Sequence, residues 1–449
     1  MMTPHSILAQ TRRGLQLVAG AGVLLVAASC SSILDVKNPN NIAEDALANP
    51  AAAGPEANGA LASLTRSLSF STLVYADATD EMDWIGSRDS WNELDKGAIG
   101  NFANEFADDQ FKYTAEARYV ADQAIVRLEG FDKAGTLASR ADLMRSYIYG
   151  AIIYSSIADQ YDDFAFSNKT VAAAPVGRAN MGRLYDTSVG YLDKALAIAT
   201  SNSDKYTILA LRARAKHGKG AWAKVTPKGT AAPANPLVND AGAVADATAA
   251  IALAAPDATV DLINNVEATA GTNIWYEVNG RNESAPGKVY VVDPTNANKY
   301  VAAIKDPISG TADPRMQARL TAFKAFGTTA GTLWITSTRE LRLILAEAAL
   351  ASGNTAEFTT QINTVRALDG KPAFAGQIAN QDMLVYERQI QLWLMRRRLI
   401  DMARFGIKDP KWTSNASYDN LFSSTGLLFP IANVERQANP CIADATKCK

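Results

Sequence analysis

Apolar residues three and four positions apart recur along most of this chain, and this periodicity constrains the fold more than any other feature. Such spacing predicts amphipathic helices, each of which buries one face against a neighbour. Two such stretches, 186–200 and 204–222, are separated only by residues 201–203, which predicts a helical hairpin. The periodic stretches before the middle of the chain are 106–128, 138–159, 186–200, 204–222 and an alanine-rich segment at 243–254. The sequence therefore predicts a mostly α-helical protein.

Helical periodicity returns in the last quarter of the chain. The spacing of Ser337 and Glu340 predicts a capping box at the start of one helix. A second helix follows and stops before Pro372. Residues 381–404 are expected to form one long amphipathic helix, with Gly406 as its C-cap. The weak repetition of helix pairs, with alanine at close-contact positions, resembles tetratricopeptide units, although no pair matches that pattern in full.

Charged residues inside the 381–404 segment are spaced for pairing on one helix. Glu387 and Gln391 are four positions apart, as are Arg397 and Asp401, and such pairs stabilise a helix face. Asp401 also lies three positions after an arginine that could lock the helix onto the preceding hairpin. We interpret these residues as structural and assign none of them to ligand binding.

The helical signal fades over residues 256–331, where Gly, Asn, Pro and Thr are frequent. We expect long loops with one hairpin near 288–292, and loops of this length are uncommon unless they have a function. The predicted organisation is one domain at 41–449. Its helical scaffold covers about 41–255 and 332–449, and a loop-rich, minor-β insertion at about 256–331 separates the two parts.

The N-terminus carries the parts of an export signal. Two arginines precede an apolar run at 14–29, which ends in small residues directly before Cys30. The run is shorter than the ~20 residues that a membrane-spanning helix needs. It predicts a lipoprotein signal peptide at 1–29, after which Cys30 carries a diacylglycerol and residues 30–40 form a tether. The alternative is an ordinary signal peptide followed by a cysteine without a role.

Charge and cysteine content limit the partners of the chain. It has 44 basic and 46 acidic residues, and nucleic acid requires concentrated positive charge, so we expect no nucleic-acid partner. Cys441 and Cys448 form an even pair near the C-terminus, which predicts a disulfide in an exported protein. Because it would close a short loop, it is expected to fix only a local tail. Catalysis by a reactive thiol is the alternative.

Residue types that carry catalysis are scarce. His217 is the only histidine beyond the predicted signal peptide, and it lies among basic neighbours without an orienting acid in sequence. Zinc ligation by several histidines is excluded by this count, and no phosphate-binding glycine motif is present. Glycoside hydrolysis needs only two carboxylates, but we attribute acid clusters such as 77–83 to solvated surface. We therefore predict no enzyme, no catalytic residue, no metal and no cofactor other than the lipid anchor.

Two stretches combine aromatic rings with polar side chains that suit sugars. Sugars present apolar C–H faces, which stack on aromatic rings, and hydroxyls, which bond carboxylate, amide and guanidinium groups. Residues 80–92 and 273–279 offer both in helix-poor parts of the sequence. Core packing is the alternative for every tryptophan among them. The candidate ligand-binding residues are Asp83, Trp84, Arg88, Trp91, Trp275 and Tyr276.

Three C-terminal segments together resemble the SusD/RagB family. The first is the helix at 340–348 with the following 353–366, the second is 387–406, and the third is 429–440, where Pro-Ile, Glu and Asn-Pro match the family's terminal pattern. The lipidated N-terminus fits the same family. The chain departs from the pattern in the second segment, where Gln391 stands for a glutamate and Met395 begins the pair that replaces an acidic residue and glycine.

The resemblance implies a SusD-like fold, with a tetratricopeptide-like scaffold and a loop-rich ligand region. It also implies an outer-membrane lipoprotein, facing the cell surface, that captures a nutrient for a partner TonB-dependent transporter. The ligand would be an oligosaccharide, or else a peptide or glycoprotein glycan, and the chemistry would be binding. The alternative function is that of a lipid-anchored scaffold that binds only proteins. A glycoside hydrolase is the third candidate function. The ligand, and any ion that orders the loops, stay open.

Overall fold

The computed structural model describes residues 46–168, 171–225, 233–264, 273–286, 290–293, 296–302, 304–328, 331–407, 409, 411–412 and 428–448. The predicted signal peptide, Cys30 and the 30–40 tether lie outside the described residues. The chain divides into two compact units, 1–49 and 50–449. Within the first, the described residues form a 3₁₀ turn at Ala46–Ala48. All further description concerns the second unit.

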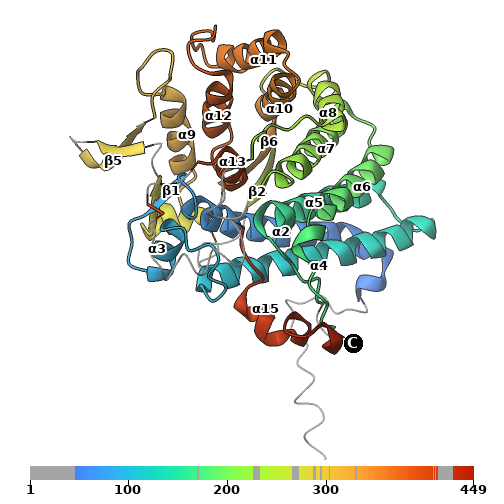
Figure 1. Cartoon of the computed structure of the whole chain (residues 1–449). Helices are drawn as coiled ribbons and strands as arrows, with labels where there is room; N and C mark the ends of the chain where they lie inside the picture. The colour runs from blue at the N-terminus through green and yellow to red at the C-terminus, as the bar shows by residue number, and fades with distance from the viewer. Residues whose placement is uncertain are drawn as a thin grey trace, which may run out of the picture. The chain divides into compact units, whose positions relative to one another are not determined.

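Helices form the scaffold of this unit (Figure 1). Successive helices pack on one another in chain order from α4 to α8, and α10 packs on α8, α11 and α12. The predicted hairpin is confirmed, because α6 packs on α7. The long helices are α2 (Ala53–Asp77), α4 (Glu105–Lys133), α5 (Arg140–Gln160), α6 (Arg183–Ile198), α7 (Asn202–Trp222), α8 (Ala241–Ile251), α9 (Pro314–Ala325), α10 (Thr338–Ala351), α11 (Thr355–Leu368) and α12 (Asn380–Gln391). The fold is thus mostly α-helical, as predicted.

Polar caps fix where several of these helices begin. The side chain of Asn104 accepts hydrogen bonds from the backbone of the first turn of α4, and Asp240 caps α8 in the same way. Asn354 caps α11 by accepting from Glu357 N at 3.1 Å.

The short helical elements are η2 (Pro50–Ala52), α3 (Asp89–Asp95), η3 (Arg178–Asn180), η5 (Tyr276–Gly280), α13 (Arg398–Phe405), α15 (Asn433–Ala438), η6 (Pro440–Ile442) and η7 (Ala445–Lys447).

Strands are few and form antiparallel pairs. β1 (Met82–Trp84) pairs with β3 (Ser284–Pro286), β2 (Thr259–Asn264) with β6 (Gly331–Ser337), and β4 (Tyr290–Asp293) with β5 (Asn296–Ala302). The last pair corresponds to the hairpin expected in the 256–331 insertion. Helix α9 lies in the same insertion and was not predicted, although its cap Asp313 followed by Pro314 is a helix-start signal.

The prediction of a single helix over 381–404 is wrong. Helix α12 ends at Gln391 and α13 begins at Arg398. Between them, Leu394 and Arg396 have φ values of 59° and 58°, a left-handed conformation that costs a side-chain-bearing residue about 1–2 kcal/mol. The predicted C-cap is confirmed, since Gly406 ends α13 with a φ of 70°.

The loop after α2 fixes this break in the helix. Glu81 Oε1 accepts a hydrogen bond from Leu394 N at 2.8 Å. The carboxylate of Asp80 binds Arg398 at 2.6 and 2.7 Å. Both acids are buried, so these contacts are shielded from water and stabilise the non-helical segment between α12 and α13. A segment more than 300 positions away in sequence therefore decides where α12 stops.

The charged residues around α12 and α13 pair mainly across elements, although Asp401 also pairs with Arg404 on its own helix. Arg397 donates to Asp159 at 2.8 Å and to Glu340 at 3.2 Å. Glu387 binds arginines of α9 and α11. Asp401 accepts from arginines on both α12 and α13. All of these side chains are buried, which supports the structural role assigned to them.

The predicted capping box at Ser337 forms only in part. Ser337 Oγ accepts from Glu340 N at 3.3 Å, but the carboxylate of Glu340 turns to Arg214, with contacts of 2.6 and 2.8 Å. Burial by itself would raise the pKa of Glu340. The positive charges of Arg214 and Arg397 outweigh burial and lower this pKa to about 2. Glu340 is therefore an ionic link between α7, α10 and the N-cap residue of α13.

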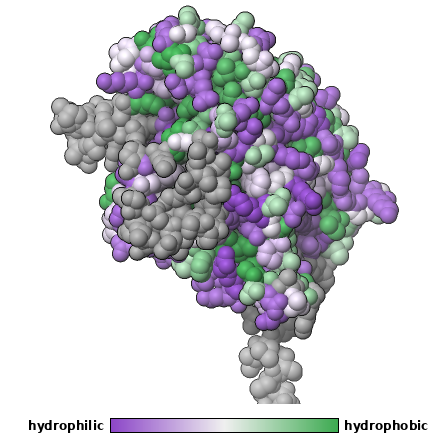
Figure 2. Space-filling model, viewed as in Figure 1, coloured by the Kyte–Doolittle hydropathy of each residue, from purple (hydrophilic) through white to green (hydrophobic). Residues whose placement is uncertain are grey.

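No described helix has both the length and the apolar character needed to cross a membrane. On the face seen in Figure 2, hydrophilic and hydrophobic residues are interspersed over the described helices. Exposed large apolar side chains include Ile85 and Phe102, which are 52% and 39% exposed.

Candidate ligand-binding face

The pairing of β1 with β3 brings the two predicted ligand-binding stretches together. Trp84 lies opposite Ser284, and Asp83 lies opposite Ala285. Strand β1 belongs to the 80–92 stretch, and β3 follows the π-helical turn η5, which contains Tyr276. Residues about 200 positions apart in sequence thus share one small face.

Glu283 holds the loop that carries Arg88. Its backbone carbonyl accepts from Ile85 N at 3.0 Å and Gly86 N at 3.1 Å, while its carboxylate accepts from Arg88 N at 3.1 Å. A Cβ at position 86 would lie 2.2 Å from Glu283 Oε2, so only glycine allows this approach. The same carboxylate also accepts from Ser87 N at 3.1 Å.

Two arginines flank the buried carboxylate of Glu277 at this face. Arg281 Nη1 lies 2.8 Å from Glu277 Oε1, and Arg88 Nη1 lies 3.9 Å from Glu277 Oε2. The guanidinium of Arg281 covers the Tyr276 ring at 4.9 Å, and that of Arg88 covers Phe106 at 4.3 Å. Burial raises the pKa of Glu277, and the arginines oppose this effect. Both guanidinium groups keep more than a third of their side-chain surface exposed.

Asp83 and Trp84 are neighbours on strand β1, so their side chains point to opposite sides of the β1–β3 pair. Lys411 Nζ lies 2.7 Å from Asp83 Oδ1 and 3.0 Å from Asp95 Oδ1, so the lysine bridges two carboxylates. The Trp84 ring is partly buried and packs against the edge of the core. Asp83 and Trp84 therefore remain accessible in part, as do Arg88 and Tyr276.

Trp91 and Trp275 lie in the core and offer no ring face to a ligand. Trp91 is 0% exposed and stacks on Phe106 with ring centroids 3.7 Å apart. Trp275 is 1% exposed, and a Cβ at Gly331 would lie 2.3 Å from its indole. Both tryptophans therefore match the core-packing alternative. The sequence could not show this, because a tryptophan beside polar residues carries no signal of how deeply it is buried. We do not include either residue in the candidate face.

Three of the four acids in the 77–83 cluster, which was expected at the solvated surface, are buried, and Asp83 is partly exposed. Asp77 is 0% exposed and accepts from Ser284 Oγ at 2.7 Å, while Glu81 holds the break before α13. Burial raises the pKa of Asp77 well above its usual value and that of Glu81 to about 8. The surface interpretation is therefore corrected. Each of these acids has a structural hydrogen bond.

His217 also differs from expectation, because the structure supplies the acid that its sequence neighbours lack. His217 Nε2 lies 2.9 Å from Glu347 Oε2, and both side chains are buried. Burial lowers the pKa of His217, although Glu347 opposes this shift. Arg404 binds the same carboxylate. The histidine thus belongs to a buried ion cluster between α7, α10 and α13, away from any accessible surface.

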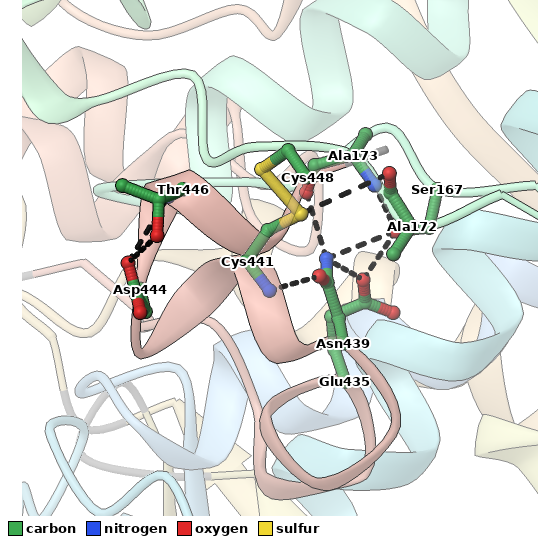
Figure 3. Close-up of a disulfide and its surroundings, with 9 residues drawn as sticks. All are labelled: Ser167, Ala172, Ala173, Glu435, Asn439, Cys441, Asp444, Thr446 and Cys448. Atoms are coloured by element: carbon green, nitrogen blue, oxygen red, sulfur yellow. Dashed lines mark hydrogen bonds between the residues drawn. A yellow bond between two sulfur atoms is a disulfide. The ribbon is translucent and has the colours of Figure 1, made fainter.

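Figure 3 shows the C-terminal tail, where Cys441 and Cys448 form a disulfide. Asn439 accepts from Cys441 N at 2.9 Å and donates to Ser167 Oγ at 3.1 Å and to Ala173 O at 2.7 Å. The tail is thereby attached to the loop that follows α5.

The comparisons with known proteins identify the fold. No family model matches the chain, and a search of curated proteins finds no significant match. Among solved structures, a SusD homolog from Bacteroides thetaiotaomicron aligns at 13% identity over 89% of this chain and 98% of that chain, with a TM-score of 0.59. SusD superfamily proteins from Bacteroides vulgatus (12% identity, 88% and 98% covered) and Parabacteroides distasonis (14%, 86% and 98%) align with TM-scores of 0.57. Identities this low show the fold alone.

Proposed function

We propose that this chain, which has the SusD-like fold, is a nutrient-binding lipoprotein that captures an oligosaccharide and delivers it to a TonB-dependent transporter in the outer membrane. The fold agrees with the three C-terminal segments that resemble the SusD/RagB family. The proposal rests on the β1–β3 pairing, which sets the strand of Asp83 and Trp84 beside the segment that follows η5, and on Glu277, whose carboxylate lies between Arg88 and Arg281. The proposed chemistry is binding without bond cleavage.

This combination of side chains suits sugar recognition. An aromatic ring at the edge of the core offers an apolar surface for the C–H face of a sugar, and it is already ordered by packing. The arginines are oriented by Glu277 and by ring contacts, so their remaining N–H groups can donate to hydroxyls at little further entropic cost. Asp83 supplies an acceptor that Lys411 holds in place. A peptide or glycoprotein glycan is the alternative ligand.

The proposed location depends on Cys30 and the 30–40 tether. A lipid on Cys30 would anchor the protein and keep it beside its transporter, which raises the effective concentration of the ligand-loaded form. Cys30→Ala is expected to leave ligand affinity intact while it abolishes membrane retention and uptake. Normal uptake by this variant would contradict the role of the anchor.

Calorimetry against a panel of oligosaccharides and peptides tests the binding function. We expect one glycan class to bind, and Trp84→Ala and Arg88→Ala to weaken it at least tenfold, about 1.4 kcal/mol. Arg140→Ala is the matched control, because Arg140 is a surface arginine with an ion pair to Asp132 on the helices. Binding that survives both face variants would refute this site. Hydrolysis of the panel without binding would favour the glycoside hydrolase.

Two experiments separate the nutrient-binding proposal from the protein-only scaffold. A pull-down with the lipidated protein is expected to recover a TonB-dependent transporter. Protease treatment of intact cells is expected to degrade the protein, because it would face outward. Protection from the protease, together with recovery of other proteins only, would favour an inward-facing scaffold.

A further inference from the structure

A pocket of about 520 Å³ lies among α9, the β2–β6 pair and the end of α12, and it contains none of the predicted ligand-binding residues. Figure 1 shows these elements next to one another in the upper half of the view. Small-molecule sites in proteins typically have volumes of about 300–1,000 Å³. The pocket is therefore large enough for a small ligand of its own.

Trp334 forms the aromatic wall of this pocket. Its side chain is partly exposed, and its ring centroid lies 6.3 Å from those of both Phe326 and Trp393. These contacts fix the indole, so a ligand that stacks on it loses little side-chain entropy of the protein. Ala318 and Ala322 of α9 also line the pocket, and their small side chains leave the space open.

A chain of planar polar groups forms another wall. Arg339 binds Asp257 through Nε at 2.5 Å and Nη2 at 2.7 Å, and its Nη1 lies 2.7 and 2.8 Å from the two oxygens of Asp369. Gln391 Nε2 donates to Asp369 at 3.2 Å, and Arg319 Nη2 donates to Gln391 O at 2.9 Å. These groups are held in place by one another before any ligand arrives.

The charges of this wall balance. Among the described residues that line the pocket there are three arginines and three aspartates, so it carries no net formal charge. The hydrogen bond from Arg339 lowers the pKa of Asp257, which therefore stays ionised at neutral pH. A charged ligand would have to break ion pairs that are already formed, whereas hydroxyl groups can add to the spare lone pairs and N–H groups.

We propose that this pocket is a second binding site, for a short neutral saccharide, which works independently of the face around Trp84 and Tyr276. Trp334 stacks on the apolar side of a sugar ring, and the wall of Arg339, Asp369 and Gln391 bonds its hydroxyls. The balanced charge selects against uronic acids and amino sugars. The proposal does not depend on the ligand of the Trp84 face.

Fluorine NMR of the full-length lipidated protein labelled with 5-fluorotryptophan tests this site, in a detergent without a sugar headgroup. The Trp334 resonance is assigned from the Trp334→Phe variant. The neutral probes are maltose, cellobiose and N,N′-diacetylchitobiose, and the charged probes are glucuronic acid and glucosamine. At about 20 mM, a probe with a dissociation constant near 1 mM saturates the site. We expect at least one neutral probe to shift the Trp334 resonance, and the charged probes to shift it less.

Two alanines of α9 give a matched pair of variants. Ala322→Phe fills the pocket, while Ala325→Phe adds the same ring at an exposed position of α9 outside the pocket lining. We expect the first to weaken the neutral probe at least tenfold, and the second to leave it unchanged. Trp84→Ala is expected to keep the Trp334 response, which separates this site from the proposed function. A Trp334 resonance that no neutral probe moves overturns the proposal, as does tighter binding of a charged probe or an Ala322→Phe variant that binds normally.

Discussion

Glu347→Ala should be among the most destabilising single substitutions in this protein. Glu347 accepts hydrogen bonds from both terminal nitrogens of Arg404, from His217 Nε2 at 2.9 Å and from Val238 N at 2.8 Å. Both Glu347 and Arg404 have fully buried side chains. Burial alone would raise the pKa of Glu347, but the charge of Arg404 outweighs it and lowers this pKa well below its usual value. The carboxylate is thus ionised at neutral pH.

The expected cost follows from this burial. Opposite charges about 3 Å apart interact by roughly 5 kcal/mol at an effective dielectric constant of about 20. Removing one partner of a buried pair typically costs about 3–5 kcal/mol, because the other charge remains without water. We therefore expect the free energy of unfolding to fall by about 3–5 kcal/mol, a large part of the ~5–15 kcal/mol typical of a folded protein. Urea unfolding followed by circular dichroism at neutral pH measures it.

An exposed ion pair provides the matched control. Lys219 Nζ lies 2.7 Å from Asp186 Oδ1, but these side chains are 50% and 57% exposed. Asp186→Ala should therefore cost less than about 1 kcal/mol. The double variant Glu347→Leu with Arg404→Met should recover most of the loss, since it leaves no buried charge of the pair unpaired. If Glu347→Ala costs no more than Asp186→Ala, the cluster does not hold these helices together.

Three further predictions concern backbone conformation, pH and the ligand face. Gly406→Ala should lower the free energy of unfolding by about 1–2 kcal/mol, because the φ of 70° disfavours a side chain, and an unchanged urea midpoint would contradict this. The pKa of Glu340 is lowered to about 2 from 4.5, so its contribution to stability is complete above pH 4.5 and is lost as the pH falls toward 2. The free energy of unfolding of Glu340→Gln, measured by circular dichroism, should therefore depend less on pH over this range than that of the unchanged protein. An equal pH dependence of the two proteins would refute the assignment. Gly86→Ala should displace the loop around Glu283 and weaken oligosaccharide binding about tenfold, or about 1.4 kcal/mol, by calorimetry, whereas Gly59→Ala, with nothing within 4 Å, should bind normally.

The parts of the candidate face that sequence reasoning found are those with a local signal. Trp84, Arg88 and Tyr276 stand in short polar–aromatic stretches, so their residue types alone marked them. Lys411 and Glu283 lack such a signal, because each acts through a partner far away in sequence, at Asp83 and in the 85–88 loop. Their roles depend on the pairing of β1 with β3, which no periodicity in the chain predicts.

The burial of single side chains is what the sequence predicts least well. Trp91 and Trp84 belong to the same stretch, yet Trp91 is fully buried against Phe106 while Trp84 stays at the edge of the core. Asp77 and Glu81 looked like surface acids and are buried with hydrogen-bonding partners. Residue type is a poor guide to such positions, because a buried carboxylate is stable only where tertiary contacts supply its donors.

The sequence by itself determined most helices of the scaffold, although not α9. Apolar residues at helical spacing, caps such as Asn354 and the C-terminal Gly406 act within a few residues of one another, so their effect is already present in the local chain. Only the tertiary structure decided that the helix predicted at 381–404 breaks before Arg398. The left-handed Leu394 costs free energy locally, and it is stable because Glu81, brought there by α2, accepts its backbone N–H inside the core.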